Sequence, residues 1–363
     1  MQTFHNPLHA QHAGQFEMFR GQLVPCHEVP SRVDFVLAEL QRRQLGPIAA
    51  PALDAAALAA SGLAEALAAV HQPRYLSFIE SAWSQWVALN PAHASQDALP
   101  SVWPVRGFRA DVEPDNFAAR MGLYSFDAGS PLTAGTWAAA QAGAACALAA
   151  ANAVLAGAPS AFALTRPPGH HAGPDFFGGY CFINNAAVAV HTLRQRFARV
   201  AVLDVDYHHG NGTQSIFYSH PDVLTVSLHG DPRTEYPFFL GHANERGEGA
   251  GLGANLNLPL PRGTGFDVWH AALHIACQAV ADFGAQALVV PLGVDTFAGD
   301  PISGFVLQSA DYLQVGQTLA SLGLPTVFTF EGGYAVAEVG VNTVNVLEGF
   351  KQASSLQVPR QMP

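Results

Sequence analysis

Short apolar runs alternate with helix-patterned segments along the chain from about residue 160 to residue 350. The apolar runs have the length of buried strands and fall at 161–165, 199–205, 223–228, 255–258, 287–292 and 326–330. Helical segments are expected at 184–196, 213–219, 266–283, 309–321 and 336–350. Repeated strand-then-helix units imply a parallel sheet, because each helix packs back onto the sheet before the next strand. The sequence therefore predicts an α/β protein of three layers, with a central, mostly parallel sheet and helices on both faces.

The first part of the chain is less regular. Pro30-Ser31 can open a helix that runs through Leu40, and helical patterns return at 53–70 and 75–86. Residues 1–30 and 91–133 are expected to be loops, the second because it is rich in Pro, Asp and Gly. No linker-like stretch or internal repeat separates these regions. We therefore expect one domain over residues 1–363.

Residues 128–165 carry no charged side chain. A long uncharged stretch raises the question of a membrane span. However, Ala, Gly, Gln, Asn and Thr dominate this stretch rather than Leu, Ile or Phe. A buried or half-buried helix at about 136–155 explains it better, and we expect no transmembrane segment.

The composition narrows the class of partner. Charged residues make up 12% of the sequence, about half of the ~25% typical of soluble domains, which suggests a large core and a buried subunit contact. The net charge of −11 argues against a nucleic-acid partner and is compatible with a cationic substrate. The cysteines form no C-x-x-C pair, and the N-terminus lacks the pattern of a signal peptide. We therefore expect a cytoplasmic protein with reduced thiols.

Polar side chains follow several of the predicted strands at the point where each strand ends. Asp206 and His208 lie two residues apart after the strand at 199–205, so both can reach one point, and Asp295 follows the strand at 287–292. The carboxyl ends of the strands are where open α/β sheets place their ligands. Two carboxylates and one imidazole leave positions open for water and substrate, which is typical of a catalytic zinc site. The alternative is that these acids only cap the following helices.

Two adjacent histidines and a tyrosine end two other predicted strands. His170 and His171 follow Arg-Pro-Pro-Gly, and paired imidazoles suit general acid and base catalysis because their pKa lies near neutrality. Asp204 and Asn211 are the nearest polar partners in the sequence that could fix their tautomers. Tyr334 follows two glycines that would let its hydroxyl approach a polarised carbonyl and stabilise an oxyanion. A rigid turn with incidental histidines, and a tyrosine in ordinary core packing, remain the alternatives.

Taken together, these motifs resemble the zinc-dependent histone deacetylase superfamily, which has the arginase–deacetylase fold. The resemblance rests on the segments 166–171, 179–185, 204–213, 227–229, 293–297 and 331–334, which occur in family order. Three further segments, 22–25, 228–232 and 239–241, look most like those of bacterial acetylpolyamine amidohydrolases. The likeness thus extends over nearly the whole chain.

The resemblance implies a role for each matching residue. Zn²⁺, with Fe²⁺ as the alternative, would bind Asp206, His208 and Asp295. His170 and His171 would move protons with Asp204 and Asn211 behind them, and Tyr334 would polarise the acetyl carbonyl. The substrate tunnel would be formed by Glu17, Phe177, Gly179, Tyr180 and Tyr236. A structural K⁺ would bind at Asp204, Asp206, His208, Ser227 and Leu228, and a second near Phe217, His220 and Val223. A homodimer is implied, with the loops at about 1–30 and 91–133 shaping the substrate entrance and the dimer contact.

The sequence departs from polyamine-cleaving relatives at one place. Where an acidic residue is expected at the tunnel mouth, this chain has Phe117-Ala-Ala-Arg120, with Asp111, Glu113 and Asp115 close by in the sequence. The expected activity is deacetylation of small cationic acetylated amines, either acetylpolyamines or acetylated diamines. A protein acetyl-lysine deacetylase and a non-catalytic binder of acetylated amines are the alternatives. A binuclear manganese ureohydrolase would need more acids around the metal than Asp206 and Asp295 supply.

Overall fold

The fold is built on one large sheet. The structure, a computed structural model, describes residues 1–357. Its main sheet has eight strands, every neighbouring pair of which is parallel. From one edge to the other the strands are β4 (Ile48–Ala49), β1 (Gln2–His5), β5 (Ser160–Leu164), β10 (Thr326–Phe330), β9 (Ala287–Leu292), β6 (Val200–Asp204), β7 (Val223–Gly230) and β8 (Asn255–Leu260).

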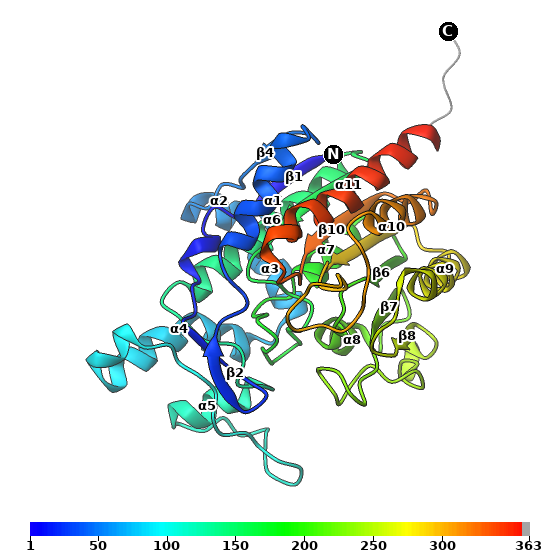
Figure 1. Cartoon of the computed structure of the whole chain (residues 1–363). Helices are drawn as coiled ribbons and strands as arrows, with labels where there is room; N and C mark the ends of the chain where they lie inside the picture. The colour runs from blue at the N-terminus through cyan, green and yellow to red at the C-terminus, as the bar shows by residue number, and fades with distance from the viewer. Residues whose placement is uncertain (358–363) are drawn as a thin grey trace.

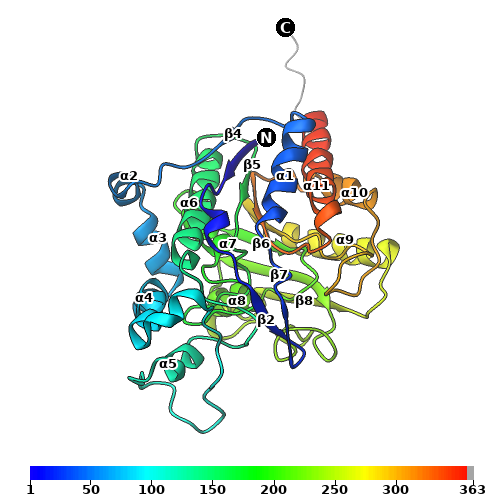
Figure 2. The same cartoon turned by 60° about the vertical axis from the view of Figure 1, so that its left-hand side comes forward.

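Helices cover both faces of the sheet. One face carries α3 (Leu63–Val70), α4 (Pro73–Leu89), α6 (Thr136–Leu155), α7 (Asn185–Leu193) and α8 (Asn211–Phe217). The other carries α1 (Ser31–Arg42), α9 (Phe266–Phe283), α10 (Asp311–Ala320) and α11 (Val336–Gln357). Figure 2 shows α1 and α11 lying side by side on that second face. The three-layer α/β fold expected from the sequence is therefore confirmed.

Alternation of side chains along each strand separates two hydrophobic cores. On β6, Val200 and Val202 pack into the core beneath α6 and α7, whereas Ala201 and Leu203 pack into the core beneath α9 and α11. Successive side chains of a strand point to opposite faces, so a strand covered on both faces must be apolar throughout. This explains why the central strands appear in the sequence as unbroken apolar runs.

The uncharged segment forms α6, within the limits predicted for it. By length and composition α6 could span a membrane, but most of its side chains are buried inside the fold. It packs on β5, β1 and α7, and its many alanines and Gly143 permit that close packing. The expectation of a buried helix at 136–155 is confirmed.

The N-terminal part differs from its prediction at several points. Residues 1–30 were expected to be a loop, but they contain β1, which joins the main sheet, and a hairpin of β2 (Phe16–Phe19) and β3 (Gln22–Pro25). The helix expected over 53–70 is divided at Gly62 (φ 80°) into α2 (Ala55–Ala60) and α3. The loop at 91–133 contains α5 (Phe117–Leu123), whose N-terminus is capped by the Asn116 side chain. These elements are short and depend on partners distant in the sequence.

Figure 1 and Figure 2 both place the β2–β3 hairpin and α5 at the end of the molecule opposite the last turns of α11. The neighbouring strands β5, β10, β9, β6 and β7 bring their carboxyl ends to one edge of the sheet. The polar residues predicted from the sequence follow those strands. The topology therefore gathers them at a single place.

Candidate active site

Asp206, His208 and Asp295 form a buried cluster at the ends of the adjacent strands β6 and β9. One ligand atom from each lies within 4.8 Å of the others. His208 Nδ1 is 2.9 Å from Asp295 Oδ2 and 3.4 Å from Asp206 Oδ1. The three residues predicted to bind a metal are thus brought together.

Backbone groups hold both carboxylates in place. The N–H of Gly332 donates to Asp206 Oδ2 (2.8 Å), and the N–H of Tyr207 donates to Asp295 Oδ1 (2.8 Å). Glycine is required at 332, since a Cβ there would lie only 2.5 Å from Asp206 Oδ2 and 2.7 Å from Asp295 Oδ2. The close approach of the Glu-Gly-Gly-Tyr segment therefore forms one wall of the cluster.

The donor set fits a divalent metal ion. Asp295 Oδ2 is buried and receives no hydrogen bond from residues 1–357. A buried carboxylate oxygen without a partner is costly unless a cation balances it. Burial and the Asp206 carboxylate raise the pKa of Asp295 to about 7, so negative charge is crowded here. Two carboxylates and one imidazole suit Zn²⁺ or a similar borderline ion.

His170 and His171 lie against each other, with ring centroids 4.0 Å apart, but their partners differ in charge. His170 Nδ1 is 2.9 Å from Asp204 Oδ2, whereas His171 Nδ1 is 2.6 Å from Asn211 Oδ1. Burial opposes protonation of His170, but Asp204 and Asp206 outweigh it and raise its pKa to about 10. Burial and the neighbouring His170 and His208 hold the pKa of His171 well below its usual value. The pair therefore combines a charged and a neutral imidazole.

The segment that carries Tyr334 is anchored by residues that the sequence reasoning did not single out. Buried Arg32 of α1 donates through Nε to the Gly333 carbonyl (2.7 Å), and its guanidinium lies 4.7 Å from the Tyr334 ring centroid. Glu331 Oε2 accepts hydrogen bonds from the backbone N–H of Gly169 (2.6 Å) and His170 (3.1 Å). The Glu28–Arg32 pair, four residues apart, is the signal that could have identified this anchor.

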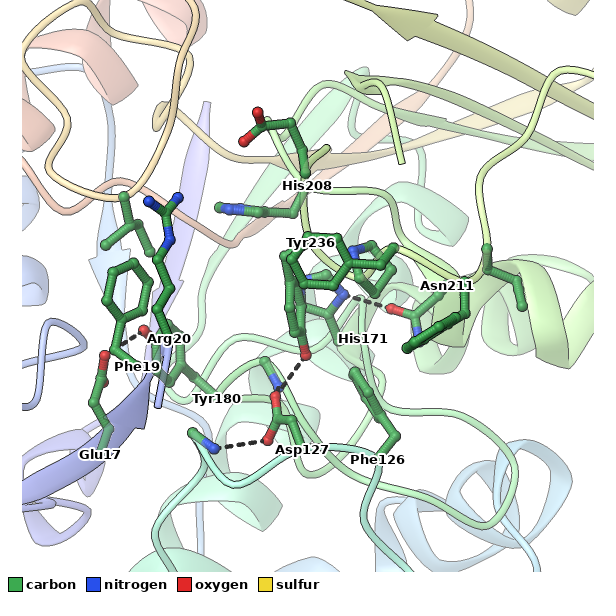
Figure 3. A pocket seen from close by; sticks show the side chains of 18 of the residues that line it. Glu17, Phe19, Arg20, Phe126, Asp127, His171, Tyr180, His208, Asn211 and Tyr236 are labelled. Carbon is green, nitrogen blue, oxygen red and sulfur yellow. Dashed lines mark hydrogen bonds between the residues drawn. The ribbon is translucent and has the colours of Figure 1, made fainter. Parts of the chain in front are cut away.

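A cavity of about 550 Å³ leads from the surface to these residues. His171, His208 and Tyr334 lie in its lining, whereas His170, Asp206 and Asp295 lie behind it. Figure 3 shows His171 hydrogen-bonded to Asn211 on one side and Glu17 and Arg20 on the opposite side. Of the residues expected to contact substrate, four line this cavity: Glu17, Gly179, Tyr180 and Tyr236.

Phe177 was expected in the tunnel wall, and this prediction is wrong. Phe177 is fully buried in the hydrophobic core, where its ring stacks on Phe182 at 5.5 Å. Its neighbour Phe176 lines the cavity instead. The reason is local geometry, since adjacent residues of an extended segment point to opposite sides.

The cavity wall also contains individual residues that the sequence reasoning did not name as site residues. Asp127 accepts hydrogen bonds from the Tyr236 hydroxyl (2.6 Å) and the Gly179 N–H (2.8 Å), and so joins two walls. Glu17 accepts from the Tyr180 hydroxyl (2.9 Å) and lies 2.8 Å from His27 Nδ1. Other lining residues that were missed are Phe19, Arg20, Phe126, Phe238, Phe239, Leu240 and Ile302. Of these, only Phe238, which follows Pro237, is an aromatic residue beside a proline or glycine.

The acids at 111–115 do not line the cavity. Asp111 pairs with Arg109 at 2.6 Å, and Glu113 pairs with Arg120 at 2.6 Å and accepts from the Tyr124 hydroxyl. The charges of Asp111 and Glu113 are therefore engaged elsewhere in the 91–133 segment.

The residues predicted to bind K⁺ do not all lie around one hollow. Asp204 and Ser227 line a small hollow behind the histidine pair, together with Thr213, Gln214, Asn255 and Asn257. Leu228 is the next residue of β7 and is fully buried. Phe217, His220 and Val223 lie around the end of α8, where the His220 N–H donates to the Phe217 carbonyl (2.9 Å). Of the residues predicted to bind K⁺, Asp204 and Ser227 line this hollow, whereas Asp206, His208, Leu228 and the second group do not.

Comparison with known proteins gives a consistent result. The histone deacetylase domain family matches residues 26–350. Acetylpolyamine amidohydrolase 1 of Pseudomonas aeruginosa is 51% identical, and the match covers 98% of this chain and 100% of that protein. The acetylpolyamine amidohydrolase of Mycoplana ramosa is 45% identical, and the match covers 96% of this chain and 99% of that protein. The crystal structure of acetylpolyamine aminohydrolase from Burkholderia pseudomallei matches with a TM-score of 0.90 and 37% identity, covering 97% of this chain and 99% of that one. The chain therefore belongs to the histone deacetylase family of metal-dependent deacetylases.

Proposed function

We propose that this protein removes the acetyl group from small cationic acetylated amines, releasing acetate and the free amine. The observation that carries the proposal is a cavity with aromatic walls that ends at His171, His208 and Tyr334. Relatives of nearly equal length that are 45% and 51% identical are named acetylpolyamine amidohydrolases, which supports this substrate class. The net charge of −11 favours the approach of a cation.

Asp206, His208 and Asp295 would hold the metal, which we propose to be Zn²⁺, with Fe²⁺ as the alternative. When bound, such an ion polarises an amide carbonyl and lowers the pKa of water from ~15.7 toward ~7. The backbone N–H groups of Tyr207 and Gly332 orient the two carboxylates and leave Asp295 Oδ2 free for this role.

His171 is the proton carrier that faces the substrate. Asn211 Oδ1 accepts the hydrogen bond from His171 Nδ1, so Nε2 keeps its lone pair and can take a proton from the attacking water. The same proton can then pass to the departing amine. His170, which lies behind and is paired with Asp204, adds positive charge next to the reacting group.

Tyr334 would stabilise the negative charge that develops on the carbonyl oxygen by donating its hydroxyl proton in a hydrogen bond. Arg32 and Asp300 fix the position of this residue, since Asp300 Oδ2 accepts from the Tyr334 N–H at 2.7 Å. Tyr180 packs edge-on against Tyr334, with centroids 5.6 Å apart. A preorganised donor of this kind supplies its stabilisation without reorganisation during the reaction.

The cavity walls suit a thin aliphatic chain that ends in a charge. Phe126 stacks on Tyr236 with centroids 5.8 Å apart, and both rings line the cavity with Tyr180. The β2–β3 hairpin and the segment 234–240 add to the wall and narrow the approach. This enclosure favours a small molecule over the acetyl-lysine of a folded protein.

We assign a structural K⁺ to the hollow beside Asp204 and Ser227, because carboxylate, hydroxyl and amide oxygens line it. The second site, near Phe217, His220 and Val223, stays a prediction. The free cysteines are consistent with a reducing compartment, and we propose the cytoplasm.

A homodimer is proposed from the exposed apolar residues at the cavity end of the molecule. Phe16, Met18 and Leu23 on the hairpin are 40–57% exposed, and Val105, Phe108 and Val112 on the 91–133 segment are 53–69% exposed. Large apolar side chains exposed on two segments at the same end of the molecule are a feature of subunit contacts. Light scattering should give twice the chain mass, and Phe108→Ser should lower it; a monomer in the unmodified protein would contradict the dimer.

The activity is tested with the purified, zinc-loaded protein. Acetate release is measured from N-acetylputrescine, from an acetylated polyamine and from an acetyl-lysine peptide in direct competition. The proposal predicts metal-dependent hydrolysis, with the small amines preferred. Preference for the peptide would favour the protein deacetylase, and binding without acetate release would favour the non-catalytic alternative.

A further inference from the structure

The β2–β3 hairpin brings two residues of opposite charge into the cavity wall, Glu17 and Arg20. Glu17 is buried and is bound by Tyr180 and His27. Arg20 is exposed, and its guanidinium forms no ion pair or hydrogen bond with the side chains of residues 1–357; its close contact is the Phe19 ring, at 5.1 Å. Figure 3 shows Arg20 on the same side of the cavity as Glu17 and Phe19, facing Tyr236 and His208.

The turn at Arg20 fixes the point from which this side chain reaches the cavity. Phe19 pairs with Gln22, so Arg20 and Gly21 form a two-residue hairpin turn, with φ of 49° and 81°. A turn with positive φ at both positions suits the twist of a hairpin, and asparagine, aspartate or glycine is favoured there. An arginine in this left-handed conformation is unfavourable in itself, and unfavourable backbone conformations of this kind are often found at functional sites.

The charges around the cavity show why Arg20 matters. Among residues 1–357 it is the only arginine or lysine that lines the cavity. The acids that line it are Glu17, Asp127 and Glu235; Asp127 is bound by the Tyr236 hydroxyl, and Glu235 pairs with Arg262 at 3.2 Å. Hydrogen bonds from tyrosine hydroxyls leave Glu17 and Asp127 charged, so the lining carries both signs. Among residues 1–357, Arg20 is its single positive charge, and no described carboxylate pairs with it.

We propose that Arg20 is a specificity-determining residue that repels the outer ammonium groups of long acetylated polyamines and so favours acetylated diamines. This inference rests on the proposed function and narrows its substrate class. Arg20 lies three positions after Glu17, a distance of roughly 10 Å along an extended strand. An acetylated diamine has one ammonium, which can lie near Glu17. An acetylated triamine carries another ammonium three or four methylene groups farther out, toward Arg20.

The test compares three amides with the same acetylated end: N-acetylputrescine, N8-acetylspermidine and the uncharged N-butylacetamide. In the zinc-loaded enzyme, Arg20→Gln should raise kcat/KM for N8-acetylspermidine by about 10-fold, as expected from removing one like charge in a partly screened site. The value for N-acetylputrescine should change less, and that for N-butylacetamide should not change. High salt should reduce the effect of the substitution.

Matched variants separate charge from shape and from folding. Arg20→Lys keeps the charge and should keep the selectivity of the unmodified enzyme. Arg20→Gly removes the charge with a residue that the turn favours, and it should behave like Arg20→Gln. Arg246→Gln removes an exposed arginine outside the cavity and should leave all three substrates unaffected.

The outcomes are distinguishable. Equal changes for the three amides in Arg20→Gln, or loss of selectivity in Arg20→Lys, would overturn the role of Arg20. Hydrolysis of all three amides with a selectivity that no Arg20 variant alters would overturn this inference alone. Failure of the zinc-loaded, unmodified enzyme to hydrolyse any of them would overturn the proposed function instead.

Discussion

The two ends of the cavity are built differently. At the inner end, Asp206 and Asp295 are fully buried, and backbone N–H groups of neighbouring strand ends bind both carboxylates. At the mouth, Phe239 is 87% exposed, and Arg20 forms no ion pair or hydrogen bond with a side chain of the described residues. A rigid, enclosed inner end suits chemistry that needs fixed distances. The exposed mouth can change residues at little cost to the fold, so selection among substrates is expected to reside there.

The largest effect is expected at the inner end, from Asp295→Asn. The amide side chain keeps the shape but removes a charged ligand. Substituting a residue that hydrogen-bonds to a metal ligand typically lowers metal affinity by about 10–100-fold. Substituting the ligand itself should lower the affinity by more than this, and activity should be lost in parallel. Metal content and kcat/KM are measured on the same sample. Asp311→Asn, at a half-buried position in the first turn of α10 and outside the cavity, is the control. A variant that keeps full metal and full activity would remove Asp295 from the site.

Tyr334→Phe should be the next most damaging change. Loss of one oxyanion donor typically lowers kcat by about 10²–10³. Because Tyr334 is no metal ligand in this account, metal content should stay at the level of the unmodified protein. Tyr218→Phe, a partly buried tyrosine away from the cavity, should show neither effect. An unimpaired Tyr334→Phe enzyme would contradict the role of the phenol.

Asn211→Asp tests whether the two histidines differ because their partners differ. A carboxylate beside His171 Nδ1 would raise the pKa of this imidazole, which burial now holds well below its usual value. His171 must be neutral to act as the base. As the pH is lowered, the activity of Asn211→Asp should therefore begin to fall at a higher pH than the activity of the unmodified enzyme. The measurement is kcat/KM against pH with N-acetylputrescine, and an acid limb that stays in place would argue against His171 as the base.

The smallest effect is expected at the mouth, from His27→Asn. The hydrogen bond to Glu17 raises the pKa of His27 despite its partial burial. A raised pKa in the folded state means that the contact stabilises the protein below the unfolded pKa of about 6.5 and loses this effect as pH rises through the folded pKa. Unfolding temperatures should differ by roughly 2 °C at pH 5.5 and converge at alkaline pH. A difference in unfolding temperature that grows as the pH rises would contradict the stabilising contact between protonated His27 and Glu17.

The contrast between the two ends also explains what the sequence could predict. Asp206, His208 and Asp295 follow long apolar strands, and the parallel topology brings such positions to one edge. The strand pattern alone therefore indicates the metal cluster and the histidine pair. The position of Tyr334 follows from the same rule, with the glycines beside it.

The parts that the sequence did not predict depend on contacts between distant segments. β1 is a short strand that is held by β5, some 160 residues away in the chain, and no local pattern marks it. Phe177 was predicted to line the cavity, but Phe176 lines it and Phe177 packs in the core. Adjacent side chains of an extended segment face opposite sides, so an error of one residue reverses the prediction. Arg32 reaches Gly333 across 301 positions. Such placements are set by tertiary packing, which periodicity alone does not specify.

The central claim is that Asp206, His208 and Asp295 together hold the divalent ion on which amide cleavage depends. It is tested most directly by stripping the protein with a chelator and titrating Zn²⁺ back while acetate release from N-acetylputrescine is followed. The account predicts no activity in the stripped protein and full recovery as the site fills, with no recovery in Asp295→Asn. Full activity in protein that elemental analysis shows to be free of metal would contradict it.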